Sequence, residues 1–254
     1  MIDILIINCL SDNYSYLIKD KKTNLVGVID PSNFREVDQK VSKTYKKLDF
    51  ILNTHHHSDH VGGNIDLKKK YNSKIICSSY ESDKIPDADI KKSDGEKFAF
   101  GEINFEVLHI PGHTLGHIAF YSEKANIIFT GDTLFSLGCG RIFEGDHKQM
   151  LASLNKIKKL PRDTKIYCGH EYTYKNAEFC MKHDRNNQDL KKNFEEIKNL
   201  RSQNLPTIPS CLEDEIKSNI FLRCDQKDLK IKLNMKNQED SKVFKKVRDL
   251  KDSF

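Results

Sequence analysis

The run Thr54-His55-His56-His57-Ser58-Asp59-His60 places four imidazoles and one carboxylate within six consecutive positions. It follows an apolar stretch at 48–53 that has the composition of a strand. In an extended segment alternate side chains point the same way, so the first and third imidazoles would face one position while Asp59 and His60 turn toward a neighbouring one. This arrangement suits two adjacent metal ions better than one. The alternative is a histidine-rich loop with incidental metal affinity.

Three more segments place a ligand-type residue just after a predicted strand. Pro111-Gly112-His113 follows a strand at 103–110, Gly131-Asp132-Thr133 follows one at 126–130, and Cys168-Gly169-His170 follows one at 165–168. Each strand end opens into a loop that contains glycine, so all four segments are expected to meet along one sheet edge. A single histidine in such a place is more often structural, but the four segments in this order indicate a metal site.

Strands and helices are mixed over the first 172 residues. Strands are expected at 2–7, 14–18, 25–30, 48–53, 74–78, 103–110, 117–122, 126–130 and 165–168, and helices at 34–47, 64–71 and 147–159. This mixture predicts an α/β fold. Farther along, Glu, Lys and Asn with spaced apolar residues predict helices within 174–203 and at 241–252. We therefore expect a catalytic domain at 1–172 and a helical domain at 173–254.

The composition excludes several classes of protein. Hydrophobic residues make up 37% of the chain and can build a core, and the net charge of +5 comes mostly from dispersed lysines. Without an arginine-rich stripe, nucleic-acid binding is not expected. Seven cysteines without a CxxC pair indicate neither a zinc ribbon nor a disulfide framework. With no leader-like N-terminus and no long apolar run, we expect a cytoplasmic protein that does not contact membranes.

Taken together, these motifs resemble the metallo-β-lactamase superfamily, and more closely its glyoxalase II, or hydroxyacylglutathione hydrolase, family. The superfamily features are T-H-H-H-x-D-H-x-G-G and the later His, Asp and His. The closer match rests on G-D-T-L-F-x-x-G-C-G-R, C-G-H-E-Y-T, T-I-P-S and a basic C-terminal helix ending in D-S-F, and it spans almost the whole chain. It implies an αββα sandwich with a smaller C-terminal helical domain.

The resemblance also implies a ligand set for two divalent ions. One ion would be held by His55, His57 and His113, and the other by Asp59, His60 and His170, with Asp132 bridging the two. Zn²⁺ is the expected metal, although Fe and Mn suit the same donors. His56, His109 and His117 have no ligand role in the pattern. His117 and Asp30 are candidates for orienting the ligands through hydrogen bonds, and Asp30 reads equally well as a turn former.

The implied reaction is hydrolysis of S-D-lactoylglutathione and other S-2-hydroxyacylglutathiones, the second step of methylglyoxal detoxification. A hydroxide shared by the two metals would attack the thioester carbonyl, which makes Asp59 and Asp132 catalytic residues. The residues implied to contact glutathione are Arg141, Phe143, Tyr172, Arg248 and Lys251. Phe143 stands where the family usually has Tyr, so one hydroxyl contact is lost. Arg248 and Lys251 share a helix face, and a solvated surface is their alternative role.

Other functions fit part of this pattern. A glutathione-persulfide dioxygenase with a single iron shares the fold, but the helical C-terminal extension with its basic residues opposes it. Another hydrolase of the superfamily, such as a lactonase or a β-lactamase, is a further alternative. A non-catalytic metal-binding protein would saturate its ligands and lack an anion pocket. We expect a monomer that binds a glutathione thioester.

Overall fold

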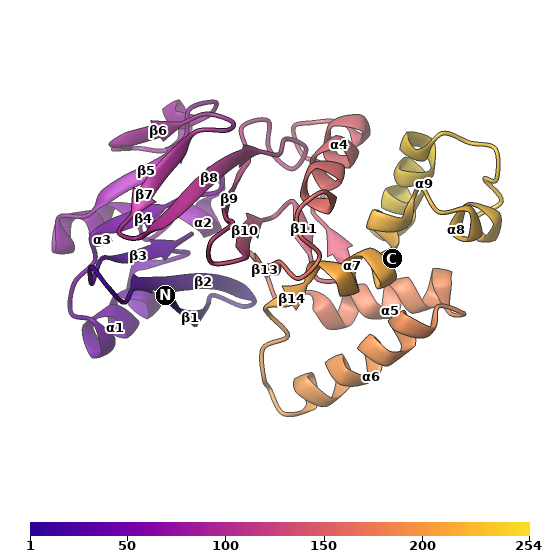
Figure 1. Cartoon of the computed structure of the whole chain (residues 1–254), viewed down its shortest axis with the longest axis horizontal. Coiled ribbons are helices and arrows are strands. Elements are labelled where there is room, and N and C mark those ends of the chain that lie inside the picture. Colours follow the sequence, from indigo (N-terminus) through magenta and orange to yellow (C-terminus); the bar gives the residue numbers. More distant parts are fainter.

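The computed structural model describes residues 1–254 and has four layers, with two sheets packed face to face between layers of helices (Figure 1). The first sheet has the order β1 (Ile2–Cys9), β2 (Asn13–Asp20), β3 (Val26–Ile29), β4 (Phe50–Leu52), β5 (Lys74–Ser78) and β6 (Ile90–Lys92). The second has the order β14 (Ser210–Cys211), β13 (Lys165–Cys168), β10 (Ile127–Gly131), β9 (Ile118–Ser122), β8 (Ile103–His109) and β7 (Lys97–Phe100). The αββα arrangement implied by the resemblance is confirmed.

The remaining elements are helices and one small hairpin, formed by β11 (Leu134–Phe135) and β12 (Gly138–Cys139). The helices of the first half are α1 (Phe34–Thr44), α2 (Ser58–Val61), α3 (Asn64–Tyr71) and the 3₁₀ turn η1 (Ser82–Lys84). Those of the second half are α4 (His147–Lys158), α5 (Thr173–Asp184), α6 (Gln188–Ser202), α7 (Leu212–Ser218), η2 (Ile220–Arg223), α8 (Lys227–Lys232) and α9 (Asp240–Asp252).

Alternating side chains of the central strands bury both faces of each sheet. On β2, Tyr16 and Ile18 pack between the two sheets, whereas Leu17 packs on the outer side with Val37 of α1. Phe105, on β8, likewise faces the space between the sheets. Because successive side chains of a strand point to opposite faces, apolar residues at successive positions are buried on both sides. This explains the nearly continuous apolar runs in the sequence.

The outer face of the second sheet and the C-terminal helices share one core. Ile128 and Ile166 of the sheet belong to the same cluster of 27 buried residues as Leu154 of α4, Phe221 of η2 and Phe244 of α9. The chain also returns to this sheet after α6, where β14 pairs with β13. The C-terminal region therefore supplies both a helical layer and an edge strand of the second sheet.

Most of the elements expected from the sequence are present, several with the expected bounds. The main differences are the short strands β6, β7, β11, β12 and β14 and the helices α2, α7 and α8, which the sequence did not reveal. The helical stretch expected within 174–203 is two helices, and the second is capped by Asn187, whose side chain accepts a hydrogen bond from the backbone of Leu190. No helix is both long and apolar enough to cross a membrane.

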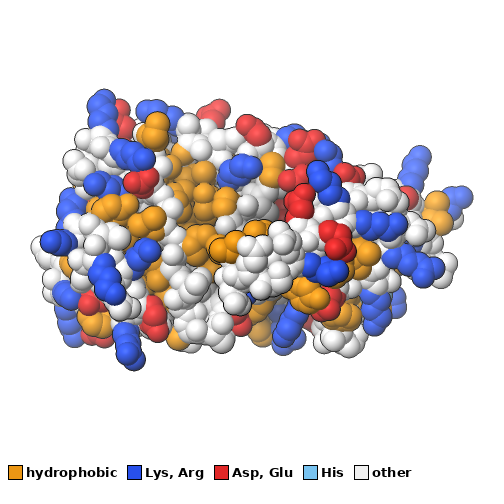
Figure 2. Space-filling view, turned by 90° about the horizontal axis from the view of Figure 1, so that it is seen from below, with side chains coloured by type: hydrophobic (Ala, Val, Ile, Leu, Met, Phe, Trp, Pro, Cys, Tyr) orange, Lys and Arg blue, Asp and Glu red, His pale blue; other side chains and the backbone are white.

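Charged side chains are dispersed on the face shown in Figure 2. Lysine and arginine side chains lie mostly toward the two ends and the rim of this view, with acidic side chains among them, and hydrophobic side chains gather left of the centre. The basic side chains do not gather into a stripe on this face, in agreement with the dispersed lysines of the sequence.

Candidate metal centre and substrate pocket

All seven predicted ligands lie together beyond the C-terminal ends of four strands. The histidine-rich run follows β4, His113 follows β8, Asp132 follows β10 directly, and His170 follows β13. β10 and β13 pair in parallel, so their C-terminal ends lie at the same edge of the second sheet, whereas β4 belongs to the first sheet. The four segments do meet, but they do so between two sheets and not along the single sheet edge that the sequence predicted.

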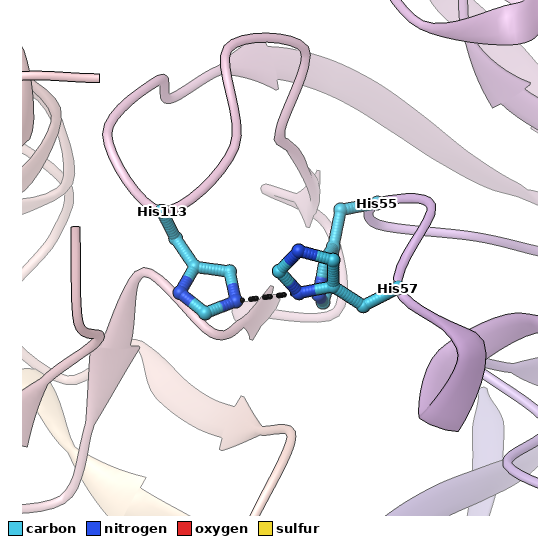
Figure 3. Close-up of side chains that lie close together, drawn as sticks. All are labelled: His55, His57 and His113. Carbon is cyan, nitrogen blue, oxygen red and sulfur yellow. Dashed lines mark hydrogen bonds between the residues drawn. The ribbon is translucent and has the colours of Figure 1, made fainter. Parts of the chain in front are cut away.

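The first group of potential ligands consists of His55, His57 and His113, whose donor atoms all lie within 4.8 Å of one another. Figure 3 shows His55 and His57 on one loop and His113 entering from the facing loop. His113 Nε2 lies 3.0 Å from His57 Nδ1, and the rings of His55 and His57 are 4.7 Å apart between centroids. Three imidazole nitrogens thus surround one small space.

The second group consists of Asp59, His60 and His170. Asp59 Oδ2 lies 3.6 Å from His60 Nε2 and 3.5 Å from His170 Nε2. Asp132 lies between the two groups. Its Oδ1 is 3.4 Å from His60 Nε2, and its Oδ2 is 3.2 Å from His170 Nε2 and 3.5 Å from His113 Nε2. One carboxylate can therefore reach both groups.

Hydrogen bonds on the outer side fix how three of the imidazoles present their nitrogens. His60 Nδ1 donates to Asp30 Oδ2 at 3.1 Å, and His170 Nδ1 donates to Asp12 Oδ1 at 2.8 Å. His113 Nδ1 donates to a backbone carbonyl at 2.7 Å. Because a proton on Nδ1 leaves Nε2 free, all three rings offer a lone pair to the centre.

Asp30 fills both roles that the sequence left open. Its backbone has a φ of +47°, as a turn requires, and its carboxylate accepts hydrogen bonds from the backbone N–H of Thr54 at 2.7 Å and from His60. His117 also supports the site, because its Nε2 accepts a hydrogen bond from the backbone N–H of Asp132 at 3.1 Å and its ring stacks on His55.

Two supporting residues carry no signal as ligands in the sequence. Asp12 lies in the turn between β1 and β2 and Asn13 is the first residue of β2, both remote in sequence from the histidine-rich run. Asp12 orients His170, and Asn13 Nδ2 donates to Asp59 Oδ2 at 2.9 Å. Only the fold brings this turn to the metal centre, so the residue types alone did not indicate these roles.

Burial keeps two of the imidazoles neutral, which is the form that binds metals. It lowers the pKa of His57 to about 4 and the pKa of His55 well below its usual value. Burial alone would raise the pKa of Asp132, but the nearby His170 and His60 outweigh it and lower that pKa, so the carboxylate is ionised.

The centre contains buried polar atoms that have no hydrogen-bond partner in the protein. They are His55 Nε2, His60 Nε2 and Asp132 Oδ1. Leaving such atoms unsatisfied is costly, so they call for a further partner. Two of these atoms belong to the two ligand groups and the third to Asp132 between them, and this mixture of nitrogen and carboxylate donors suits divalent cations. The residues therefore fit the binding of divalent metal ions.

A pocket of about 740 Å³ opens beside this centre. Its lining contains ligand residues, including Asp59, Asp132 and His170, together with all five residues predicted to contact the substrate. Phe143 is 61% exposed and stands edge-on to His57 and His113, with centroid distances of 5.6 and 5.2 Å. Tyr172 stacks on His170 at 4.7 Å. Both aromatic rings thus line the pocket beside the donor groups.

The two basic residues of α9 differ in their surroundings. Arg248 is only 5% exposed, and its guanidinium donates to Cys139 O at 2.8 Å and to Asp252 Oδ1 at 3.0 Å. The solvated-surface alternative is therefore wrong for Arg248. Lys251 Nζ lies 5.1 Å from the ring centroid of Phe179, and burial lowers its pKa. Both residues present cationic groups to a pocket that also contains the metal ligands.

Comparison with known proteins places the chain in a class. Residues 11–170 match the metallo-β-lactamase superfamily, and residues 171–254 match the hydroxyacylglutathione hydrolase C-terminus. The solved structure of BLEG-1 B3 metallo-β-lactamase superposes with a TM-score of 0.66 at 21% identity, covering 87% of this chain and 99% of that one. Fold and donor set thus define a metallo-β-lactamase superfamily protein.

The relationship to one branch of the superfamily is much closer. Hydroxyacylglutathione hydrolase from Pelagibacter ubique is 49% identical over 99% of this chain and 100% of its own length. The chain belongs to the hydroxyacylglutathione hydrolase family. The structure of TTHA1623, in a di-iron-bound form, is 27% identical over 65% of this chain and 91% of that one, with a TM-score of 0.56.

Proposed function

We propose that this protein hydrolyses the thioester bond of S-2-hydroxyacylglutathiones, S-D-lactoylglutathione among them, and releases glutathione and the hydroxy acid. This is the second step of methylglyoxal detoxification. One observation carries the proposal: a single pocket joins two groups of metal-type donors to the cationic side chains of α9. Family membership supports the same reaction.

We further propose two divalent ions per chain, with Zn²⁺ the expected metal. His55, His57 and His113 would hold one ion, Asp59, His60 and His170 the other, and Asp132 would contact both. When bound, such ions lower the pKa of water and polarise a carbonyl group. The di-iron form of TTHA1623 is consistent with a centre for two ions and with iron as an alternative metal.

The chain's own residues then position the reactants. Asp59 is aimed into the pocket and held by Asn13, so it can orient an attacking water molecule. The phenyl ring of Phe143 shields the first ligand group from solvent on one side. A thiolate is a good leaving group, so a dedicated acid is not required. The remaining task is to bind the glutathione part, which we assign to Arg141, Tyr172, Arg248 and Lys251.

The C-terminal region supplies two of these four residues, the cationic side chains of α9. We propose that residues 1–172 form the catalytic domain and 173–254 the part that contacts glutathione. Glutathione carries two carboxylates remote from the thioester, and charged hydrogen bonds to them are among the strong ones. Arg248 and Lys251 lie on one face of α9, where they can approach the same ligand.

The decisive experiment measures hydrolysis of S-D-lactoylglutathione by purified protein together with its metal content. We expect glutathione release without oxygen consumption, and two ions per chain. Oxygen uptake with glutathione persulfide and no thioester cleavage would establish the dioxygenase instead. Metal binding without turnover of either substrate would leave a metal-binding protein. A cytoplasmic location and a monomeric state stay predictions of the sequence.

A further inference from the structure

Side chains from the C-terminal region form hydrogen bonds with the backbone of the hairpin β11–β12. Glu215 Oε2, on α7, accepts a hydrogen bond from the backbone N–H of Leu137 at 2.8 Å. Asn219 Nδ2 donates to the carbonyls of Phe135 at 3.3 Å and Gly138 at 3.1 Å, and it also lies 3.0 Å from Glu215 Oε2. Two neighbouring side chains thus bind three backbone groups of a four-residue turn.

Helix α5 contributes further contacts to the same turn. Asn176 Nδ2 donates to Ser136 O at 3.1 Å, and Cys180 Sγ donates to Leu137 O at 3.2 Å. Leu137 itself has a φ of +54°, which is unfavourable for a residue with a branched side chain. Such a conformation persists where the surroundings enforce it, and here side chains of α5 together with Glu215 and Asn219 hold the turn.

The hairpin connects the metal centre to the substrate pocket. Asp132 lies just before β11, and Arg141 lies just after β12. The two chain segments that flank the hairpin lie close together. Gly140 N donates to Thr133 O at 3.2 Å, and a Cβ on Gly140 would lie only 1.8 Å from Asp132 O. A shift of the turn would therefore move both ends of the hairpin together.

Glu215 is an unusual residue for a purely structural place. It is 2% exposed, and its hydrogen-bond partners are neutral groups, with no cation beside it. Burial raises its pKa for this reason. An apolar residue would pack there at lower cost, but it could not accept the hydrogen bond from Leu137 N.

We propose that Glu215 and Asn219 are positioning residues of the active site. They set the place of the β11–β12 hairpin and, through it, the places of Asp132 at the metal centre and Arg141 at the pocket. The inference rests on the proposed function where it concerns substrate, and on the metal centre alone where it concerns Asp132. Neither residue touches the reacting atoms.

The test compares Glu215→Ala and Asn219→Ala with Glu215→Gln, which keeps an acceptor for Leu137 N. Glu213→Ala is the matched control, because Glu213 lies on the same helix, is 50% exposed and pairs only with Lys217. For the two positioning variants we expect KM for S-D-lactoylglutathione to rise about tenfold, as for one lost buried hydrogen bond. In the same two variants the affinity for zinc, measured by chelator competition, should fall. The kcat at saturating zinc and substrate should change much less.

Glu215→Gln and Glu213→Ala should keep both KM and zinc affinity. Hydrogen exchange of the Leu137 amide gives a readout independent of catalysis and should accelerate in Glu215→Ala alone among the Glu variants. If the alanine variants do not fold, Asn219→Ser, which keeps one donor, replaces them.

Folded variants with a lower Tm but unchanged KM and zinc affinity would overturn the proposal and leave a structural role only. If the wild-type protein cleaves no glutathione thioester, the proposed function fails. Zinc affinity and amide exchange then still decide whether the two residues position the hairpin.

Discussion

Replacing Asp30 by Asn should loosen one of the two proposed ions without disturbing the fold. Asn has the same shape and tolerates the φ of +47° at this position. Its oxygen can still accept the hydrogen bond from Thr54 N, but its amide group would then face His60 Nδ1 and Thr54 Oγ1, and only the hydroxyl can turn to accept from it. Two donors cannot pair, so His60 must move its proton to Nε2, the nitrogen that points into the metal centre.

The expected loss follows from that tautomer change. A hydrogen bond to a charged group contributes about 1.5–3 kcal/mol, and removing such a partner from a ligand lowers metal affinity by roughly 10- to 100-fold. Chelator competition with elemental analysis should therefore find the ion bound by His60 released first. The ion held by His55, His57 and His113 should stay bound at chelator concentrations that remove the other.

A matched control separates this effect from a general loss of stability. Asp20 is also fully buried and caps a turn, accepting hydrogen bonds from Thr23 Oγ1 at 2.6 Å and Glu102 N at 3.0 Å. It lies at the opposite end of β2 from the metal centre. Asp20→Asn should lower stability and leave metal affinity unchanged. An Asp30→Asn protein that retains both ions as firmly as the wild type would refute the reasoning.

The other predictions concern the bridge, the basic helix and pH. Asp132→Ala should reduce both metal occupancy and turnover; a single tightly held ion in fully active protein would contradict the proposed pair. Lys251→Ala should raise KM about 10- to 100-fold with kcat nearly intact, because contacts to unreacting carboxylates stabilise ground and transition states alike. An unchanged KM would show that Lys251 does not bind the substrate. Arg248→Ala should also lower Tm, because the buried guanidinium binds Cys139 O; calorimetry measures this, and an unaltered Tm would speak against it. Burial alone would raise the pKa of Asp20, but hydrogen bonds from Thr23, Glu102 and Lys22 outweigh it and lower that pKa. The ionised Asp20 carboxylate therefore stabilises the folded protein above about pH 4, and this contribution is lost as the pH falls further. Urea titrations at several pH values should find this pH dependence in the wild type and not in Asp20→Asn.

The sequence was sufficient to find the donor residues that the structure brings together, and their assignment as metal ligands, which the resemblance implies, stays a prediction. His55, His57, Asp59 and His60 lie in one run, Asp132 and His170 come one and two residues after a strongly apolar strand, and His113 comes four residues after one. Long apolar runs also predicted the central strands with little error. Periodicity and loop position carry this information without any knowledge of the tertiary structure.

The parts that escaped prediction depend on distant contacts. The strand at Ser210–Cys211 has two residues and exists only because β13 offers it a partner. Asp12 becomes an orienting residue only because the β1–β2 turn reaches His170. The surroundings of Arg248 were equally hidden, since a basic residue in a lysine-rich helix reads as exposed until Phe221 and Cys139 are found against it.

The apolar cluster common to the second sheet and the C-terminal helices bears on how the molecule unfolds. A chain cut after residue 172 would leave Ile128, Ile166 and Leu154 without Phe221 and Phe244, so a large hydrophobic surface would face water. The two regions should accordingly melt in one cooperative transition, with equal calorimetric and van't Hoff enthalpies. Damage to the distal helices would then abolish catalysis by collapsing the whole molecule, even where the metal ligands are intact.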